Sequence, residues 1–110
     1  MAVTPISCLE EFENAIAQDR AVVVEFCATW AGLCRVIRPV FERFSGLPEF
    51  AAGVDFHSVD LDEAFDVAQK AGVGPVPVFM AFRNGVKNAE AVAPGPDALY
   101  ELIDKARTKS

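Results

Sequence analysis

The sequence contains a nearly continuous apolar stretch, Ala21-Val22-Val23-Val24-Glu25-Phe26-Cys27, that continues as Ala28-Thr29-Trp30-Ala31-Gly32-Leu33-Cys34. Three consecutive valines favour a β-strand, and Glu25 is the only charge in the run. A run of this kind is typical of a central strand that is covered on both faces. Because ligands of open α/β sheets bind beyond the carboxyl ends of the strands, residues 29–34 are expected at the functional edge.

The segments around this strand show helical spacing. Ser7 and Glu10 form a capping-box pattern that predicts a helix to about residue 18, with Leu9, Phe12 and Ile16 on one face. A short strand over residues 3–6 precedes it. After Gly32, a second helix is expected to continue through Pro39 with a kink and to stop near residues 46–48. Its predicted inward residues are Val36, Ile37, Val40, Phe41 and Phe44.

The second half of the chain predicts strands over residues 54–59 and 76–82, with a short helix over 63–70 that Gly72 closes. Asn84-Gly85 is a strong hairpin signal, which pairs residues 78–82 antiparallel with 86–92. Pro96 opens a last helix. Its expected inward residues are Ala98, Leu99, Leu102, Ile103 and Ala106.

The resulting order of elements is β-α-β-α-β-α-β-β-α. Helices between strands imply crossover connections and a mostly parallel sheet, to which the hairpin adds antiparallel edges. The sequence therefore predicts an α/β fold with a mixed central β-sheet flanked by helices, in a single domain spanning residues 1–110.

Charge and composition exclude several partners. The net charge of −6 repels polyanions, so neither nucleic acid nor an anionic membrane is an expected partner. The apolar run is shorter than the ~20 residues that cross a bilayer. The start of the chain lacks the basic residues and long apolar stretch of a secretory signal, and the three cysteines are an odd number. These features predict a reducing, cytoplasmic location.

Several fragments together resemble the thioredoxin family. They are Val-Val-Glu-Phe before Ala-Thr-Trp-Ala-Gly-Leu-Cys, Pro39, Val59-Asp60-Leu61-Asp62-Glu63, Val76-Pro77-Val78-Phe79 and Phe82-Arg83-Asn84-Gly85. The resemblance extends from about Ile6 to Ala106. It implies a thioredoxin fold, a role in protein disulfide reduction and cell redox homeostasis, and no cofactor or metal.

The motif that carries the family's chemistry is altered in this chain. The family has Trp-Cys-Gly-Pro-Cys, whereas this sequence has Trp30-Ala31-Gly32-Leu33-Cys34. By this resemblance Ala31 replaces the cysteine whose thiolate attacks the substrate disulfide, and Cys34 matches the more buried resolving cysteine. Dithiol turnover is therefore expected to be lost or strongly impaired.

Glu25 matches the family's buried aspartate, which takes the proton of the second cysteine. Burial in the apolar strand should raise the pKa of its carboxyl. The longer glutamate side chain leaves a second interpretation open, in which the carboxylate lies near a strand end and reaches water.

The family's peptide-binding surface maps onto Trp30, Gly32, Val76, Pro77 and Ala93. Val76-Pro77 matches a cis-proline that faces the active site, and Ala93 stands where the family usually has glycine. The implied partners are disulfide-containing or thiol proteins bound as extended peptides, with a thioredoxin reductase as electron donor.

Two other cysteines lie outside this motif. Cys27 lies two residues beyond Glu25 on the same side of the strand and is interpreted as a small buried hydrophobe, while Cys8 falls in a first helical turn. The spacing alone gives no reason to expect a disulfide between Cys27 and Cys34. The carboxylates of Asp60, Asp62, Glu63 and Asp66 fit a helix N-terminus better than a metal site.

Three alternatives to an impaired reductase remain open on the sequence. The chain is a non-catalytic peptide-binding or protein-binding module, an engineered active-site variant of an active thioredoxin, or a monothiol enzyme that uses Cys34 with glutathione.

Overall fold

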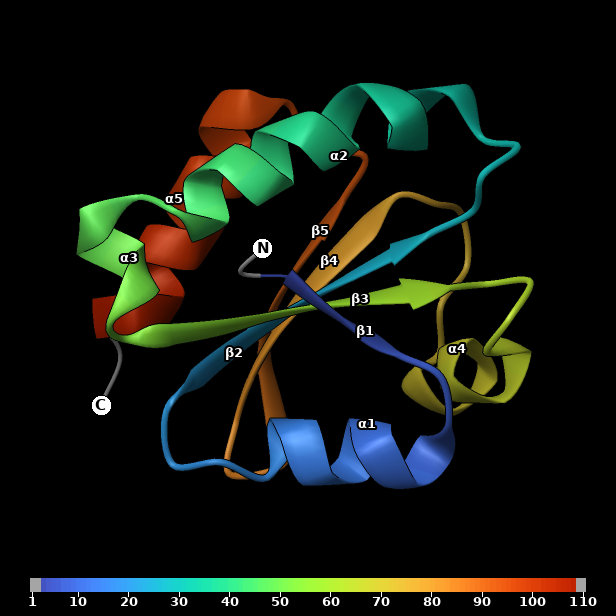
Figure 1. Ribbon diagram of the computed structural model, residues 1–110, viewed down its shortest axis with the longest axis horizontal. Coiled ribbons are helices and arrows are strands. Elements are labelled where there is room, and N and C mark those ends of the chain that lie inside the picture. Colours follow the sequence, from blue (N-terminus) through green and yellow to red (C-terminus); the bar gives the residue numbers. More distant parts are fainter. Residues whose placement is uncertain (1–2, 109–110) are drawn as a thin grey trace.

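The computed structural model describes residues 3–108 and is organised around a five-stranded sheet with the strand order β1-β3-β2-β4-β5. The strands are β1 (Val3–Ile6), β2 (Ala21–Cys27), β3 (Val54–Asp60), β4 (Val78–Arg83) and β5 (Val86–Val92). One side of the sheet carries α1 (Leu9–Ile16) and α4 (Phe65–Ala71), as Figure 1 shows. The other side carries α2 (Gly32–Ser45), α3 (Pro48–Ala51) and α5 (Pro96–Thr108). This confirms the predicted α/β class and the mixed sheet between helices.

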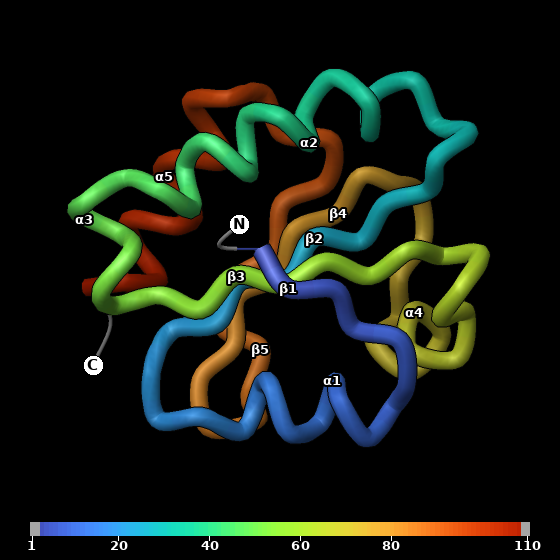
Figure 2. The backbone as a smooth tube through the Cα atoms, viewed as in Figure 1, coloured from blue at the N-terminus to red at the C-terminus, as the bar shows by residue number. Residues whose placement is uncertain are grey.

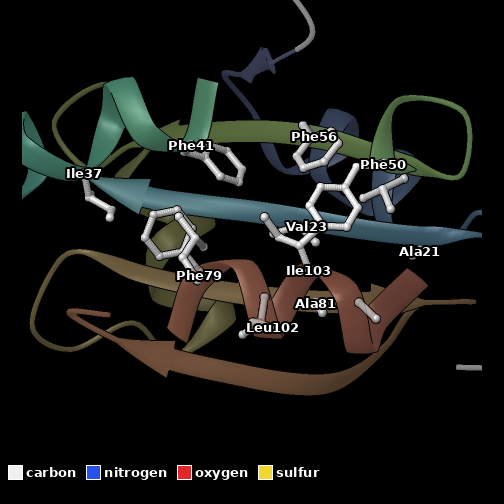
Figure 3. Packing of buried hydrophobic residues seen from close by; sticks show 13 residues of the cluster. Ala21, Val23, Ile37, Phe41, Phe50, Phe56, Phe79, Ala81, Leu102 and Ile103 are labelled. Atoms are coloured by element: carbon white, nitrogen blue, oxygen red, sulfur yellow. The ribbon is translucent and has the colours of Figure 1, made fainter. Parts of the chain in front are cut away.

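Strand β2 is the centre of the sheet, as its composition predicts. All seven of its residues are buried, and it pairs with β3 on one side and with β4 on the other. Its side chains alternate between two cores. Val23 packs under α2 and α5, whereas Val22 and Val24 face α1 and α4. Figure 3 shows the first core, where Ile37 and Phe41 of α2 point toward the sheet. Phe41 and Phe79 have ring centroids 5.0 Å apart.

The sheet is less parallel than predicted. β1 and β2 run parallel to β3, but β4 runs antiparallel to β2, and β5 runs antiparallel to β4. The reason is the position of α4, which stays beside the carboxyl ends of β2 and β3 and does not return the chain to their amino ends (Figures 1 and 2). β4 therefore starts where β3 ends.

The hairpin prediction is confirmed. β4 pairs with β5 in the predicted antiparallel sense. Asn84 and Gly85 have φ values of 53° and 79°, the left-handed conformation that a tight two-residue turn of this kind needs at both positions. At the end of α4, Gly72 adopts the left-handed C-cap that its position predicts.

Helix α2 continues through Pro39, as predicted, and ends with Gly46 as C-cap. Its fully covered residues are spaced for one helical face: Cys34, Ile37, Phe41 and Ser45. The prediction that Val36 faces inward is wrong, because Val36 lies about 100° around the helix from Ile37 and is 69% exposed. In α5 the same geometry leaves Ala98 exposed while Leu99, Leu102, Ile103 and Ala106 are buried.

Other local predictions need correction. The N-terminal partner of α1 is Glu11, whose carboxylate accepts hydrogen bonds from the backbone N–H and the hydroxyl of Ser7, and not Glu10. The helix α3 was not predicted. Pro48 occupies its first turn, where the missing N–H is tolerated. Strand β4 starts at Val78 because Pro77 has no N–H to give to a sheet.

The start of α4 also differs from the prediction. The Asp60 carboxylate accepts the backbone N–H groups of Asp62 at 2.8 Å and Glu63 at 3.4 Å, which holds residues 60–63 in a turn. The helix begins only at Phe65. None of the helices within residues 3–108 is both long and apolar enough to cross a membrane.

Candidate active site

The candidate site lies where β2 ends and α2 begins. Trp30 is 66% exposed, and Ala31 is the N-cap of α2 with an extended backbone, φ −87° and ψ 118°. The carbonyl of Ala31 accepts the N–H groups of Cys34 and Arg35 at 3.1 and 3.4 Å. Position 31 therefore faces the free N–H groups at the start of a helix, and these groups stabilise negative charge. The methyl side chain of Ala31 has no group that can ionise or act as a nucleophile.

Cys34 lies in the first turn of α2 and points into the protein. Its relative exposure is 0%, and its Sγ accepts a hydrogen bond from the backbone N–H of Ala28 at 3.4 Å. No external disulfide can reach this sulfur without a movement of the helix start.

Glu25 is a buried carboxyl, with 2% exposure, on the same face of β2 as Val23. Its Oε1 lies 3.8 Å from Nε of Arg38, and within residues 3–108 its buried Oε2 has no hydrogen-bond partner. Burial raises the pKa of Glu25 to about 7, although the Arg38 charge and the Cys27 thiol oppose the change. The carboxyl thus titrates near neutral pH, which is the range that a proton acceptor needs.

Cys27 is the last residue of β2 and is 3% exposed. Burial is the main cause that raises the pKa of its thiol, followed by the negative charge of Glu25 and the neighbouring Cys34 thiol. A cleft of about 170 Å³ reaches Glu25, Cys27 and Arg38 from the β1 and β3 side. The buried charge and thiol are therefore open to small molecules from that side.

The expected peptide surface lies beside α2. The Val76–Pro77 peptide bond is cis, and the carbonyl of Pro77 accepts the N–H of Ala93 at 2.7 Å. Ala93 has φ 48°, a left-handed conformation that favours glycine. An apolar cleft of about 220 Å³ runs along this region. It is lined by Leu33, Val36, Ile37, Val40, Pro77, Ala93, Pro94, Gly95 and Pro96.

The predicted site residues fall into separate groups: some line the apolar cleft, and others lie in the interior. Pro77 and Ala93 line the apolar cleft together with Leu33, whereas Trp30, Gly32 and Val76 do not. Cys34 and Glu25 belong to the interior behind Ala31. Arg38 was missed, although its position one helical turn after Cys34 places it on the same side of α2. Among the described residues, no cluster of His, Cys, Asp or Glu is placed to hold a metal ion.

The amino-acid sequence is similar to that of known thioredoxins. The family model described as Thioredoxin matches residues 4–105. Thioredoxin-1 of Saccharomyces cerevisiae is 44% identical over 101 residues, which cover 92% of this chain and 95% of the yeast protein. Thioredoxin of Malassezia sympodialis is 40% identical over 103 residues, with 92% and 95% coverage.

Solved structures give the same result. The crystal structure of Malassezia sympodialis thioredoxin (Mala s 13) superposes with a TM-score of 0.92 at 37% identity and covers 96% of this chain and 91% of that chain. Plasmodium falciparum thioredoxin superposes with a TM-score of 0.85 at 31% identity, with 94% and 98% coverage. The fold is the thioredoxin fold, and the chain belongs to the thioredoxin family of thiol-disulfide oxidoreductases.

Proposed function

We propose that this chain binds disulfide-containing or thiol proteins as extended peptides on a thioredoxin surface, and that Ala31 deprives it of normal dithiol turnover. Ala31 occupies the position at which the family's attacking cysteine stands. The sulfur that remains in the motif, Cys34, is fully covered.

The burial of Cys34 is the observation that carries this proposal. An attacking thiol must approach a disulfide sulfur in line, and Cys34 offers no exposed surface for that approach. The same burial argues against the monothiol alternative, in which Cys34 itself would have to form the mixed disulfide. A second intramolecular thiol acts at an effective molarity of ~10⁵ M or more, which millimolar external thiol does not replace.

The surface around the motif supports peptide binding. Trp30, Leu33 and Val36 are 66%, 60% and 69% exposed, so large apolar side chains are gathered beside the apolar cleft. Exposed apolar patches of this kind mark binding sites for other proteins. Within residues 3–108, none of the backbone hydrogen bonds formed outside helices and strands uses the N–H or the carbonyl of Val76. These groups are therefore available to pair with an extended peptide.

The partners of this activity follow from the family. Trp30, Gly32, Val76, Pro77 and Ala93 form the proposed peptide surface. A thioredoxin reductase is the proposed electron donor for any variant that regains dithiol turnover. Free thiols suit a reducing compartment, and we place the protein in the cytoplasm.

Insulin reduction tests the proposal. The chain and its Ala31→Cys variant are assayed with dithiothreitol as the donor. We expect at least a roughly hundredfold faster rate in Ala31→Cys, because the restored thiol faces the helix start and has Cys34 as an intramolecular resolver.

Ala31→Ser is the matched control, since it adds an atom of similar size without a nucleophilic sulfur, and it should stay inactive. The proposal fails if the chain with Ala31 already reduces insulin as fast as the Ala31→Cys variant. Silence of Ala31→Cys with an intact fold would support a pure binding module.

A further inference from the structure

Cys27 and Cys34 approach each other from two different elements. Cys27 ends β2 and lies on the face that β2 turns toward α2, since it follows Val23 and Glu25 in the alternation of the strand. Cys34 is the first of the inward residues of α2. Its Sγ lies 3.4 Å from the amide nitrogen of Ala28, which is the atom directly after the Cys27 carbonyl.

Neither thiol contacts the proposed peptide surface, and the two thiols differ in their access to solvent. Cys34 is 0% exposed and lines none of the clefts described above. Cys27 borders the cleft of about 170 Å³ beside β1 and β3, together with Glu25. That volume corresponds to roughly six water molecules, so a molecule as small as hydrogen peroxide fits but a peptide does not.

We propose that Cys27 and Cys34 form a second redox centre, an interior dithiol that a small peroxide converts reversibly into an intramolecular disulfide. This inference does not rest on peptide binding or on the loss of turnover at Ala31. It needs only the two sulfurs, the cleft and a proton acceptor.

The chemistry balances with hydrogen peroxide as the oxidant. Cys27 gives its proton to the Glu25 carboxylate, and the thiolate sulfur attacks one peroxide oxygen. The O–O bond breaks, the leaving hydroxide takes the proton back from Glu25 and departs as water, and Cys27 becomes a sulfenic acid. The Cys34 sulfur then attacks the Cys27 sulfur, the S–O bond breaks, and the leaving hydroxide takes the Cys34 proton and departs as a second water. Two thiols are oxidised by two electrons, and one peroxide is reduced to two waters.

The raised pKa of Cys27 keeps most of this thiol protonated, so oxidation should be slow compared with that of an exposed thiolate. The buried Cys27–Cys34 pair should therefore be oxidised by sustained exposure to peroxide and not by brief contact with protein disulfides. Its expected reductant is a small dithiol such as dithiothreitol.

The test uses the full chain with Cys8→Ser, which leaves Cys27 and Cys34 as the only thiols. The protein is incubated with hydrogen peroxide and then unfolded, its thiols are counted, and it is digested with trypsin. Cleavage after Arg20 and Arg35 puts both cysteines on one peptide. We expect both thiols to disappear together, this peptide to lose two hydrogen atoms, and dithiothreitol to restore it.

The control is Cys8→Ser combined with Cys27→Ala, which should form no intramolecular disulfide and should keep the Cys34 thiol under the same peroxide. Circular dichroism checks that both proteins are folded. The proposal is overturned if Cys27 and Cys34 stay reduced under sustained peroxide, long after the exposed Cys8 of the parent chain is fully oxidised. It is also overturned if the disulfide joins two chains, or forms only after unfolding.

Discussion

The guanidinium of Arg38 lies 3.8 Å from the carboxyl of Glu25, yet it does not restore the usual acidity of that group. The Arg38 side chain is 41% exposed, so solvent weakens its attraction, whereas the Glu25 side chain is 3% exposed and loses nearly all of its hydration. Desolvation therefore outweighs the ion pair, and the pKa of Glu25 is raised to about 7.

Because desolvation of Glu25 outweighs its ion pair with Arg38, the free energy of unfolding depends on pH. A carboxyl with a raised pKa in the folded state contributes stability that is complete below about 4.5, its unfolded value, and is lost as the pH rises through about 7. The loss amounts to about 3 kcal/mol. Glu25→Gln removes this titration, so its free energy of unfolding relative to the parent should improve by about 3 kcal/mol between those two pH values. Urea unfolding at several pH values measures it.

The control for this series is Glu10→Gln, which removes an exposed carboxylate of α1. This variant shows the effect of losing one carboxylate that stays exposed to water in the folded chain. A Glu25→Gln difference that does not change between about pH 4.5 and 7 would contradict the buried, protonated carboxyl.

Arg38→Met tests the charge that opposes desolvation. The substitution keeps most of the side-chain length but removes the positive charge, so the pKa of Glu25 should rise further above about 7. NMR titration of the Glu25 side-chain carboxyl carbon measures the change. If the carboxyl titrates near its ordinary value in the parent chain, Glu25 has no part in proton transfer at neutral pH.

Ala93→Gly should stabilise the protein. Ala93 has φ 48°, where a methyl group is strained by roughly 1–2 kcal/mol, and glycine removes that strain while adding some freedom to the unfolded chain. The expected net gain is about 1 kcal/mol, or about 4 °C in Tm, by thermal unfolding.

The matched control is Ala89→Gly in β5, where the backbone is extended and glycine should instead destabilise by about 0.5–1 kcal/mol. Equal losses of stability in both variants would show that the conformation of Ala93 is not strained.

Val36→Asp should weaken peptide binding. Val36 lines the apolar cleft, so a charge there should cost about 1.4 kcal/mol, or tenfold in Kd, for an extended apolar peptide. Trp30 is the only tryptophan, so its fluorescence reports binding of the alkylated insulin B chain directly at this surface.

Val86→Asp is the control. Val86 is 64% exposed, close to the 69% of Val36, but it begins β5 beside the hairpin turn. It pairs with Arg83, next to Phe82 opposite Val22, and so lies near the amino end of β2, whereas Trp30 follows the carboxyl end of that strand. Binding should be unchanged in this variant. If Val86→Asp weakens binding as much as Val36→Asp does, the peptide does not occupy the cleft beside α2.

Local sequence patterns were sufficient to predict most of the helices and strands. The apolar run of β2, the inward spacing of Ile37 and Phe41, and the Asn84-Gly85 turn each depend on the period of a helix or strand or on the conformational range of one residue. The structure confirms all three. The alanine at position 31 was also visible in the sequence, because residue type is read without any structure.

The amino-acid sequence by itself determined the central strand, the long helix after it and the absence of sulfur at position 31, because these depend on neighbouring residues and on residue type. Only the tertiary structure decided the direction of β4, the burial of Glu25 beside Arg38 and the approach of Cys27 to Cys34. The physical reason is that solvation and charge depend on distances in space, and these distances are set when α2 packs across the end of β2.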